Sequence, residues 1–488
     1  MDRREFSKRS LLLTAGILTG SHKIGMANEA GDTNNYYEEP TKKLPIRNFD
    51  VVVAGGGTAG VVAAIAAARH GAKTALIEVK GYTGGTVTEG GTALHSFYNL
   101  WKAFPGVTKR QVIRGIPAEI IDRLVKVGGA TGHCEMERGY DYDSVCTAID
   151  TESYKLITME MLDEAGVFMA MNTLVVGAVR DRARIKGVIT ESRAGRELFC
   201  AKCLIDCTAY GDLAAHAGAE YNEPNDYSVC NSVGIGNVGL DKYYEYLKSH
   251  NAVGQLARGM RSGRPDQVIR VGSESVNLPD GFTQEARDIG MAMITTSVHD
   301  NYMMFIKCNL KLPVSPTDRD TVSKAELTIR KNMAKAVELF KKYVPGCENA
   351  FMARTSPKLC IRRARLITCD YDITHEDVID GRHFNDDVFV YGFHDMAPRL
   401  QIKDGGTYGF PYRALCVKGI DNLLASGMLI TSDHRAHMST RNTVCSMAQG
   451  QASGTAAALC SAKKCGTRDL RYSDLYEALK KSGVYFDS

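Results

Sequence analysis

The first strong pattern in the chain is an alternation of apolar runs and glycine turns between residues 49 and 78. Residues 49–54 (FDVVVA) form a short apolar run that enters a glycine-rich turn, as a buried parallel strand does. The alanine-rich residues 61–70 predict a slim helix, and residues 73–78 (KTALIE) predict a second strand. This order of strand, turn, helix and strand is typical of the start of a parallel sheet.

Later segments are read from the same kinds of pattern. Apolar residues recur at helical spacing between residues 322 and 344, which predicts an amphipathic helix that Pro345-Gly346 ends. Thr374 stands where an N-cap would begin a shorter helix. Further elements are expected as a helix at 150–164 and as strands at 173–179 and 201–207.

The glycine turn after the first run predicts a dinucleotide site. Gly55, Gly57 and Gly60 fit G-x-G-x-x-G, in which the glycines allow a tight turn, a close approach of the pyrophosphate and close packing of the helix. The helix that follows supplies free N–H groups and the positive end of its dipole to phosphate. Glu78 lies 18 residues after Gly60, where a carboxylate would accept hydrogen bonds from a ribose diol.

Composition bounds the class of protein. A chain of 488 residues with 44% hydrophobic and 24% charged residues suggests two domains and a large core. The net charge of +4, without a basic stripe, argues against nucleic acid as a partner. The 14 cysteines are scattered, and the cluster Cys200, Cys203 and Cys207 fits a core strand better than a metal or redox site.

The N-terminus has the layout of a signal peptide. The basic pair Arg3-Arg4, with Phe6 beside it, resembles a twin-arginine export signal, and the apolar run 11–18 is too short to span a bilayer. We therefore expect a signal peptide at residues 1–28 and a polar linker at 29–48. The protein would then be exported to the periplasm. No later stretch predicts a transmembrane helix.

Three further glycine elements point to flavin rather than nicotinamide. Gly84-Gly85-Thr86 resembles the second glycine turn of FAD domains, and residues 206–212 (DCTAYGD) resemble their second strand-to-turn motif, with Ala209 at one glycine position. Residues 420–427 resemble a third strand that closes on Gly427, and residues 449–458 the terminal helix. On these motifs the chain resembles the FAD-dependent oxidoreductase family with a glutathione-reductase-2-like FAD domain.

The resemblance implies an α/β fold: a Rossmann-type FAD-binding domain, with a parallel sheet and a β crossover, into which an α+β substrate domain is inserted. The FAD domain would span residues 49–240 and 398–488, and the substrate domain residues 241–397. FAD would be held without a covalent bond, although His95 lies in a region where some flavoenzymes attach it. The implied cofactor-binding residues are Gly55, Gly57, Thr58, Ala59, Gly60, Glu78, Gly84, Gly85, Thr86, Val176, Thr208, Gly211, Asp212 and Gly427.

A second G-x-G-x-x-G at residues 234–239 does not predict a separate nicotinamide site. Residues 226–232 make a poor strand before it, and no strand that ends in an acid follows at the right distance. Within the resemblance this stretch matches the strand that enters the substrate domain.

The candidate catalytic residues are His394, His434 and Arg363. Histidine titrates in the range useful for moving a substrate proton, and an arginine can hold a carboxylate or a developing oxyanion. The alternatives are loop histidines without a catalytic role and an Arg363 that pairs with Asp372 or Asp377. His434 and His437 could also bind a metal, but no third ligand is evident, and we expect no metal.

The expected function is hydride transfer between flavin N5 and a small organic substrate, with an electron partner that the sequence does not name. Two alternatives remain open at this point. One is a flavin enzyme without redox chemistry that acts on polysaccharide-derived material, and the other is a flavin-binding module without enzymatic activity.

Overall fold

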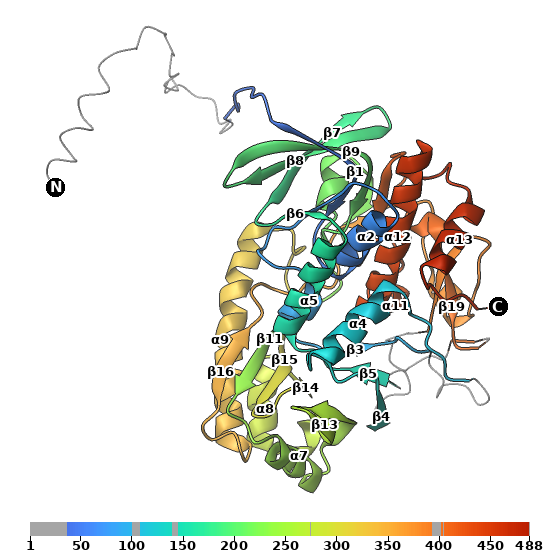
Figure 1. Cartoon of the computed structure of the whole chain (residues 1–488). Helices are drawn as coiled ribbons and strands as arrows, with labels where there is room; N and C mark the ends of the chain where they lie inside the picture. The colour runs from blue at the N-terminus through green and yellow to red at the C-terminus, as the bar shows by residue number, and fades with distance from the viewer. Residues whose placement is uncertain are drawn as a thin grey trace, which may run out of the picture. The chain divides into compact units, whose positions relative to one another are not determined.

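The computed structural model describes residues 37–99, 108–138, 145–273, 275–392, 402–403 and 405–487 (Figure 1). Residues 44–488 form one compact unit. The signal peptide expected at residues 1–28 lies outside the described residues. Within this compact unit, the two larger of the four sheets among the described residues are associated with the two larger hydrophobic cores.

The first sheet, sheet 1, contains the parallel strands expected from the N-terminal pattern. Its parallel part runs in the order β6, β2, β1, β9 and β20. Apolar side chains cover both faces of β1 and β2 near their carboxyl ends, as a sheet between helices requires. The strands are β1 (Ile46–Ala54), β2 (Thr74–Ile77), β6 (Phe168–Ala170), β9 (Gly195–Asp206) and β20 (Leu423–Ala425).

Strand β9 belongs to two arrangements at once. Its first half pairs antiparallel with β8 (Arg184–Ser192), which pairs antiparallel with β7 (Leu174–Asp181). Its last residues, up to Asp206, pair parallel with β1 and β20. The antiparallel strands therefore form the expected β crossover, and the predicted α/β fold class is confirmed.

Helices cover both faces of sheet 1, and two of them pack at unusually short range. The first is α2 (Thr58–Arg69), and the second is the buried helix α12 (Thr443–Lys463). A β-carbon at Gly450 would lie 2.2 Å from the Ala59 carbonyl oxygen, and one at Gly454 would lie 2.2 Å from that of Ala63. Only glycine fits at these two positions of α12, which lie one helical turn apart.

The second sheet, sheet 2, has nine strands, and its pairings are antiparallel. The long amphipathic helix α9 (Arg319–Tyr343) packs on it with the apolar residues read from the sequence, and Figure 1 shows this helix along one side of the sheet. In sheet order the strands are β16 (Phe351–Thr355), β11 (Val229–Gly236), β15 (Tyr302–Leu310), β14 (Met291–Thr296), β13 (Arg264–Ser273), β12 (Val253–Arg261), β4 (Cys134–Arg138), β5 (Val145–Thr147) and β3 (Leu94–His95).

The sequence interpretation of the stretch before residue 234 was partly wrong. Residues 229–236 form the fully buried strand β11, although residues 226–232 looked like a poor strand. Burial between neighbouring strands outweighs the weak local propensity of Asn231 and Ser232. Two positions inside this strand, Gly234 and Gly236, carry glycine because a β-carbon there would press on Arg354 and Phe351. The second glycine motif therefore makes room for side chains and opens no nucleotide turn.

Sheet 2 draws strands from both sides of residue 241, since β3, β4, β5 and β11 precede it. The domain boundaries expected at 240/241 and 397/398 stay a proposal. The remaining elements are α3 (Thr86–Gly90), α4 (Ile116–Lys126), α5 (Thr151–Glu164), α6 (Asp212–His216), β10 (Tyr221–Asn222), α7 (Leu240–Ser249), η1 (Ser275–Asn277), α8 (Asp280–Asp288), β17 (Leu366–Ile367), α10 (His375–Ile379), β18 (Asp387–Tyr391), β19 (Tyr408–Pro411), η2 (Tyr412–Ala414), α11 (His437–Thr440) and α13 (Tyr472–Lys481).

Two of the helix starts read from the sequence have the expected caps. The Asp150 side chain accepts from the Ser153 N–H at 2.7 Å at the start of α5. Thr374 and Asp377 form a reciprocal capping box at the start of α10.

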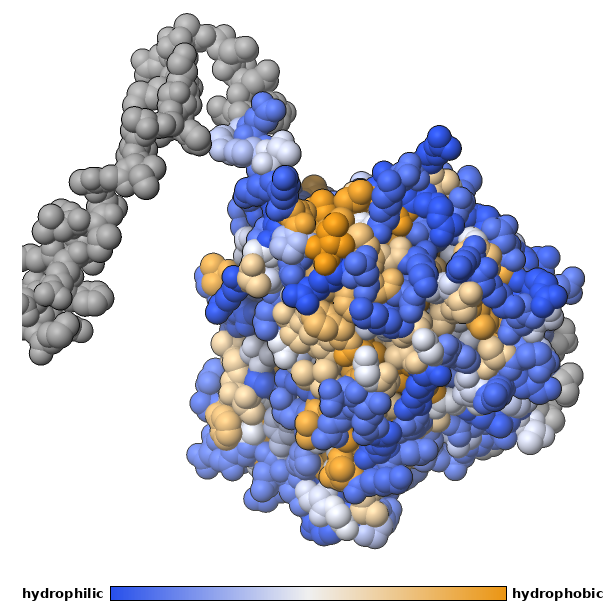
Figure 2. Space-filling model, turned by 45° about the horizontal axis from the view of Figure 1, so that its top comes forward, coloured by the Kyte–Doolittle hydropathy of each residue, from blue (hydrophilic) through white to orange (hydrophobic). Residues whose placement is uncertain are grey.

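Charged and polar side chains cover most of the face shown in Figure 2, with hydrophobic ones gathered in parts of it. Among the helices that the structure describes, none combines the length and hydrophobicity needed to cross a bilayer.

The contact between α2 and α12 yields a stability prediction. Gly454→Ala places a methyl group against the Ala63 carbonyl, so the helices must separate and the free energy of unfolding should fall by about 1–3 kcal/mol. The midpoint of urea unfolding measures the loss. Gly90→Ala is the control, since a β-carbon there meets open space. An unchanged midpoint for Gly454→Ala would show that this close contact does not exist.

Candidate FAD groove and adjoining cavity

The glycine turn after β1 is held by contacts that only glycine permits. Gly55 has φ +97°, and its added β-carbon would lie 2.4 Å from the Cys207 carbonyl oxygen. A β-carbon at Gly60 would lie 1.8 Å from the Gly55 carbonyl oxygen. At Gly57 the nearest heavy atom would be 4.0 Å away, at Gly85. Gly55 and Gly60 therefore shape the turn, and Gly57 leaves open space above it.

Glu78 follows β2 directly and faces this open space. One of its carboxylate oxygens accepts from the Gly56 N–H at 2.7 Å, and the other accepts from the Lys80 N–H at 2.9 Å. The side chain is buried, yet it lines the groove described below. A carboxylate has about four acceptor positions, so Glu78 can still receive hydrogen bonds from a ligand.

The second glycine turn packs on the first. The Gly84 N–H donates to the Gly56 carbonyl at 2.9 Å, and a β-carbon at Gly85 would lie 2.9 Å from the Gly57 α-carbon. Gly84 and Gly85 both have positive φ, at +108° and +49°. Two segments about 30 residues apart thus meet backbone to backbone, which explains why both carry glycine.

A buried carboxylate fixes the turn after β9. Asp206 accepts from the Thr208 N–H at 2.9 Å, from the Thr208 hydroxyl at 2.7 Å and from the Ala214 N–H at 2.8 Å. Burial raises the pKa of Asp206 to about 6 in spite of these donors. Ala209, which stands at a glycine position of the motif, adopts φ +67° without glycine.

Two more predicted residues support the same region. Asp212 begins α6 and pairs with Arg365 at 2.9 Å, and Gly211 before it has φ +69°. Gly427 follows β20 with φ +105°, and its N–H donates to the Gln449 side chain at 2.7 Å. The interior helix α12 thus holds the third glycine element.

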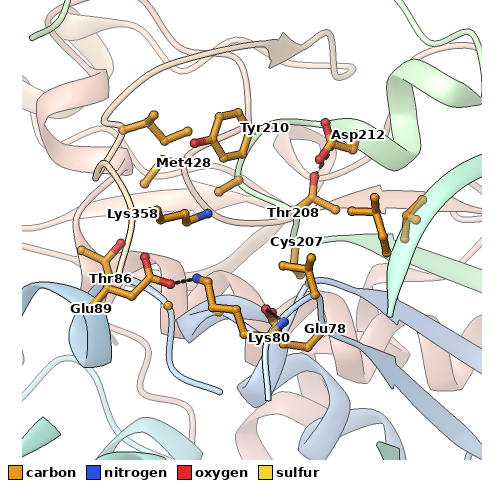
Figure 3. Close-up of a pocket in the computed structure, with 18 of the residues that line it drawn as sticks. Glu78, Lys80, Thr86, Glu89, Cys207, Thr208, Tyr210, Asp212, Lys358 and Met428 are labelled. Carbon is orange, nitrogen blue, oxygen red and sulfur yellow. Dashed lines mark hydrogen bonds and ion pairs between the residues drawn. The ribbon is translucent and has the colours of Figure 1, made fainter. Parts of the chain in front are cut away.

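These turns surround a groove of about 380 Å³ at the carboxyl ends of β1, β2 and β9 (Figure 3). Of the predicted cofactor-binding residues, Gly55, Gly57, Glu78, Gly85, Thr86, Thr208 and Asp212 line it. Val175 lines it where Val176 was expected. Thr58, Ala59, Gly60, Gly84, Gly211 and Gly427 do not line it, and lie in the turns and helix start that shape it.

The groove fits FAD on its own geometry. Its floor is glycine backbone at the start of the twelve-residue helix α2, and a carboxylate stands at the end of the second strand. FAD would rest its pyrophosphate on the turn at Gly57 and its ribose against Glu78. These contacts need no covalent bond.

The sequence did not single out two lysines of the groove. Lys80 forms an ion pair with buried Glu89, and Lys358 reaches the groove from the loop after β16 (Figure 3). Burial, together with the nearby Lys358, lowers the pKa of Lys80 to about 8. No motif marks either lysine, because each reaches the groove only through the fold.

A second cavity, of about 430 Å³, adjoins the groove. Thr86, Cys360, Ile361 and Met428 line both spaces, so the two are direct neighbours. The wall of the second cavity comes mainly from sheet 2 and from the segment before α12. Its other lining residues are Gly90, Thr92, Ala93, Leu94, His95, Tyr227, Cys230, Ser232, Arg270, Ile294, Phe305, Lys307, Arg362, Met438, Arg441, Asn442 and Thr443.

Two of the three predicted catalytic residues, Arg363 and His434, share one partner, which the sequence did not suggest. Arg363 and His434 both contact the same carboxylate oxygen of Asp226, at 2.6 and 2.7 Å. The partners considered for Arg363 had been Asp372 and Asp377. Neither Arg363 nor His434 lines the groove or the second cavity. His394 lies outside the described residues, so its role stays a prediction.

Other titratable residues have local partners. His437 is buried, with its ring nitrogens on Ser432 and on the Arg362 carbonyl, whereas His434 is exposed on Asp226. Cys200 and Cys203 lie on β9. In the ranges that the structure describes, no three His, Cys, Asp or Glu side chains are grouped to hold a metal ion.

A sequence model of the family described as FAD dependent oxidoreductase matches residues 50–479, which include every strand of sheet 1 beyond the first residues of β1. The chain belongs to this family. It is an FAD-dependent oxidoreductase, and FAD is its cofactor.

Other similarities are short or distant. The soluble pyridine nucleotide transhydrogenase of Chromohalobacter salexigens is 49% identical over 49 residues, which are 10% of this chain and 11% of that protein. A geranylgeranyl bacteriochlorophyll reductase-like protein of Thermoplasma acidophilum aligns over 90% of this chain and 83% of its own, with 11% identity and a TM-score of 0.44. The p-nitrophenol 4-monooxygenase of Pseudomonas putida aligns over 90% of this chain and 89% of its own, with 10% identity and a TM-score of 0.44. Nothing about the substrate of this oxidoreductase follows from similarities at this level.

The open space at Gly57 yields a prediction about FAD. Gly57→Val should leave the protein folded, because a β-carbon there comes no closer than 4.0 Å to another residue, but the side chain should fill the place of the pyrophosphate. We expect at least a hundredfold weaker retention of FAD, on the order of 3 kcal/mol. The measurement is FAD released from purified protein on heating, with circular dichroism to check the fold.

Gly177→Ala is the matched control, since its β-carbon makes ordinary contact with Ile189 and does not line the groove. A Gly57→Val protein that copurifies with a full complement of FAD would place the cofactor elsewhere.

Proposed function

We propose that this oxidoreductase transfers hydride between N5 of its flavin and a small organic substrate that occupies the second cavity. FAD, when bound, supplies the two-electron donor or acceptor. The observation that carries the proposal is that the two spaces adjoin, with Thr86, Cys360, Ile361 and Met428 lining both. A substrate in the second cavity would therefore lie next to a cofactor in the groove.

The residues around the second cavity supply the means to position a substrate. Polar groups of Ser232, Asn442 and Thr443 line it together with the apolar side chains of Leu94 and Ile294. A cavity lined by both apolar side chains and convergent polar groups is typical of sites that orient small molecules.

For proton transfer we retain His394 and His434 as candidates, with Arg363 as a positioning residue. Arg363 donates to Asp226, which contacts the His434 ring, so it fixes that imidazole through the carboxylate. Tyr227 lies between this cluster and the second cavity, because it lines the cavity and its ring centroid lies 4.9 Å from that of His434.

The test of the proposed function follows flavin absorbance without oxygen, with alcohols and sugars as hydride donors to the oxidised flavin and keto acids and enoates as acceptors from the dithionite-reduced flavin. A donor should bleach the oxidised flavin, and an acceptor should reoxidise the reduced flavin, in a one-to-one ratio. Ile294→Trp, which fills the second cavity and leaves the groove intact, should slow this reaction by about tenfold or more and should retain FAD.

Ile46→Trp is the control, because that isoleucine is exposed at the start of β1. Dithionite should reduce the flavin of all three proteins equally. Reaction at the wild-type rate in Ile294→Trp would mean that the substrate binds elsewhere, and a flavin that no organic compound reduces or reoxidises would contradict hydride transfer.

We also propose export by the twin-arginine route, which carries folded proteins and so suits a chain that must first acquire FAD. Changing Arg3 and Arg4 together to lysine should retain the precursor in the cytoplasm, as fractionation would show. Changing Lys8 to arginine preserves charge outside the pair and serves as the control. Equal periplasmic amounts of all three proteins would refute this route.

A further inference from the structure

The second cavity carries an excess of positive charge. Arg270, Lys307, Arg362 and Arg441 line it, and no aspartate or glutamate is among its described lining residues. These cations come from β13, β15, the loop after β16 and the segment between α11 and α12. Four cations from separate segments meet at one cavity, which is not the arrangement of a solvated face of one element.

Lys307 and Arg362 are held without a carboxylate. Arg362 donates to the Ser228 carbonyl at 3.4 Å and to the Asn309 side chain at 3.2 Å. The Lys307 ammonium lies 4.7 Å from the centroid of the Phe305 ring. In the part of the chain that the structure describes, neither side chain forms an ion pair with an acidic residue. Arg270 is oriented by the Gln255 amide oxygen, at 2.8 Å.

Two titratable groups at this cavity have lowered pKa values, and the nearby cations are among the causes. Burial, and then repulsion from Arg362, Arg270 and Arg441, lower the pKa of Lys307 to about 8. The pKa of the neighbouring Cys230 thiol falls to about 6, through hydrogen bonding with Cys360 and attraction to Arg362, Lys307 and Arg441. Repulsion from the arginines is thus one cause of the lowered pKa of Lys307, after burial, and an anion that entered would relieve this repulsion.

We propose that the second cavity binds a small organic anion, with a carboxylate or phosphate head between Lys307 and Arg362 and an apolar part against Leu94, Ile294 and Phe305. The proposal rests on the proposed function in that this anion is the substrate of the flavin. Arg441 lines the same cavity from the segment between α11 and α12, and its charge adds to the attraction.

The test measures binding to the oxidised holoenzyme by calorimetry, so it needs no turnover. The probes are acetate, benzoate and phenyl phosphate, with acetamide and benzamide as neutral counterparts of the two acids. We expect at least one anion to bind about tenfold or more tightly than its neutral counterpart, as expected for charge-assisted hydrogen bonds. The comparison of benzoate with phenyl phosphate identifies the preferred head.

Lys307→Met should weaken binding of the preferred anion by about tenfold or more, and Lys307→Arg should largely restore it. Lys311→Met is the matched control, because Lys311 follows the same strand but is exposed and outside the cavity. Arg362→Met provides a second variant if Lys307→Met does not fold.

The pH dependence gives an independent readout. The Lys307 ammonium is present below pH 8 and is lost as the pH rises through 8, so anion affinity should fall above that value in the wild type. The fall should disappear in Lys307→Arg, whose guanidinium stays charged. The groups that face Lys307 are Arg270, Arg362, Arg441 and the Cys230 thiol, and Cys230→Ser removes the one that also titrates near this range.

The alternative role for these cations is to stabilise the reduced flavin. In that case Lys307→Met would lower the flavin reduction potential and leave anion affinity unchanged, which would overturn the proposal. Equal affinity of every acid and its amide, or absence of anion binding, would overturn it too. Failure of the proposed function is distinct, because anions would then bind with the expected selectivity while no organic compound reduced or reoxidised the flavin.

Discussion

The fold depends on the close approach of backbone segments at the carboxyl ends of the parallel strands. The turn at Gly55 touches the carbonyl of Cys207, the turn at Gly85 touches Gly57, and Gly450 of α12 touches Ala59. Each contact excludes a β-carbon, and together they hold β1, β2, β9 and two helices around one point. The groove for FAD opens at this point, in the crevice where open α/β sheets bind their ligands.

Sheet 2 is fixed to the same point by polar contacts. Arg354 of β16 donates to the carbonyls of Thr88 and Glu89 at 2.7 and 2.9 Å, and the Ser232 hydroxyl donates to the Gly90 carbonyl at 2.6 Å. Helix α3 is therefore held between the glycine turns on one side and sheet 2 on the other. This junction sets the second cavity against the groove, so the positions of both spaces depend on one set of contacts.

Local sequence patterns predicted the parts of the site that local geometry determines. The glycines, Glu78 and the strand ending in Asp206 could be read from the chain because each turn needs its residue type at a fixed spacing. Lys358 reaches the groove, and Lys307 and Arg362 reach the second cavity, only through the packing of distant segments, and no spacing marks them. The same limit explains Arg363, whose partner Asp226 lies 137 residues away. In the opposite case, a local pattern can be misleading. The spacing of Gly234 and Gly236 resembled a nucleotide turn, but side-chain packing around β11 explains why both are glycine.

Membership of the family favours redox chemistry over the two alternatives, a flavin enzyme without redox chemistry and a binding module without activity. A crystal structure of the purified protein soaked with the preferred carboxylate or phosphate tests the central claim most directly. The account predicts FAD with its pyrophosphate on the turn at Gly57, its ring system at the mouth of the second cavity, and the anion within hydrogen-bond distance of Lys307 and Arg362. FAD bound elsewhere, or an FAD ring system that ends away from the second cavity, would contradict it.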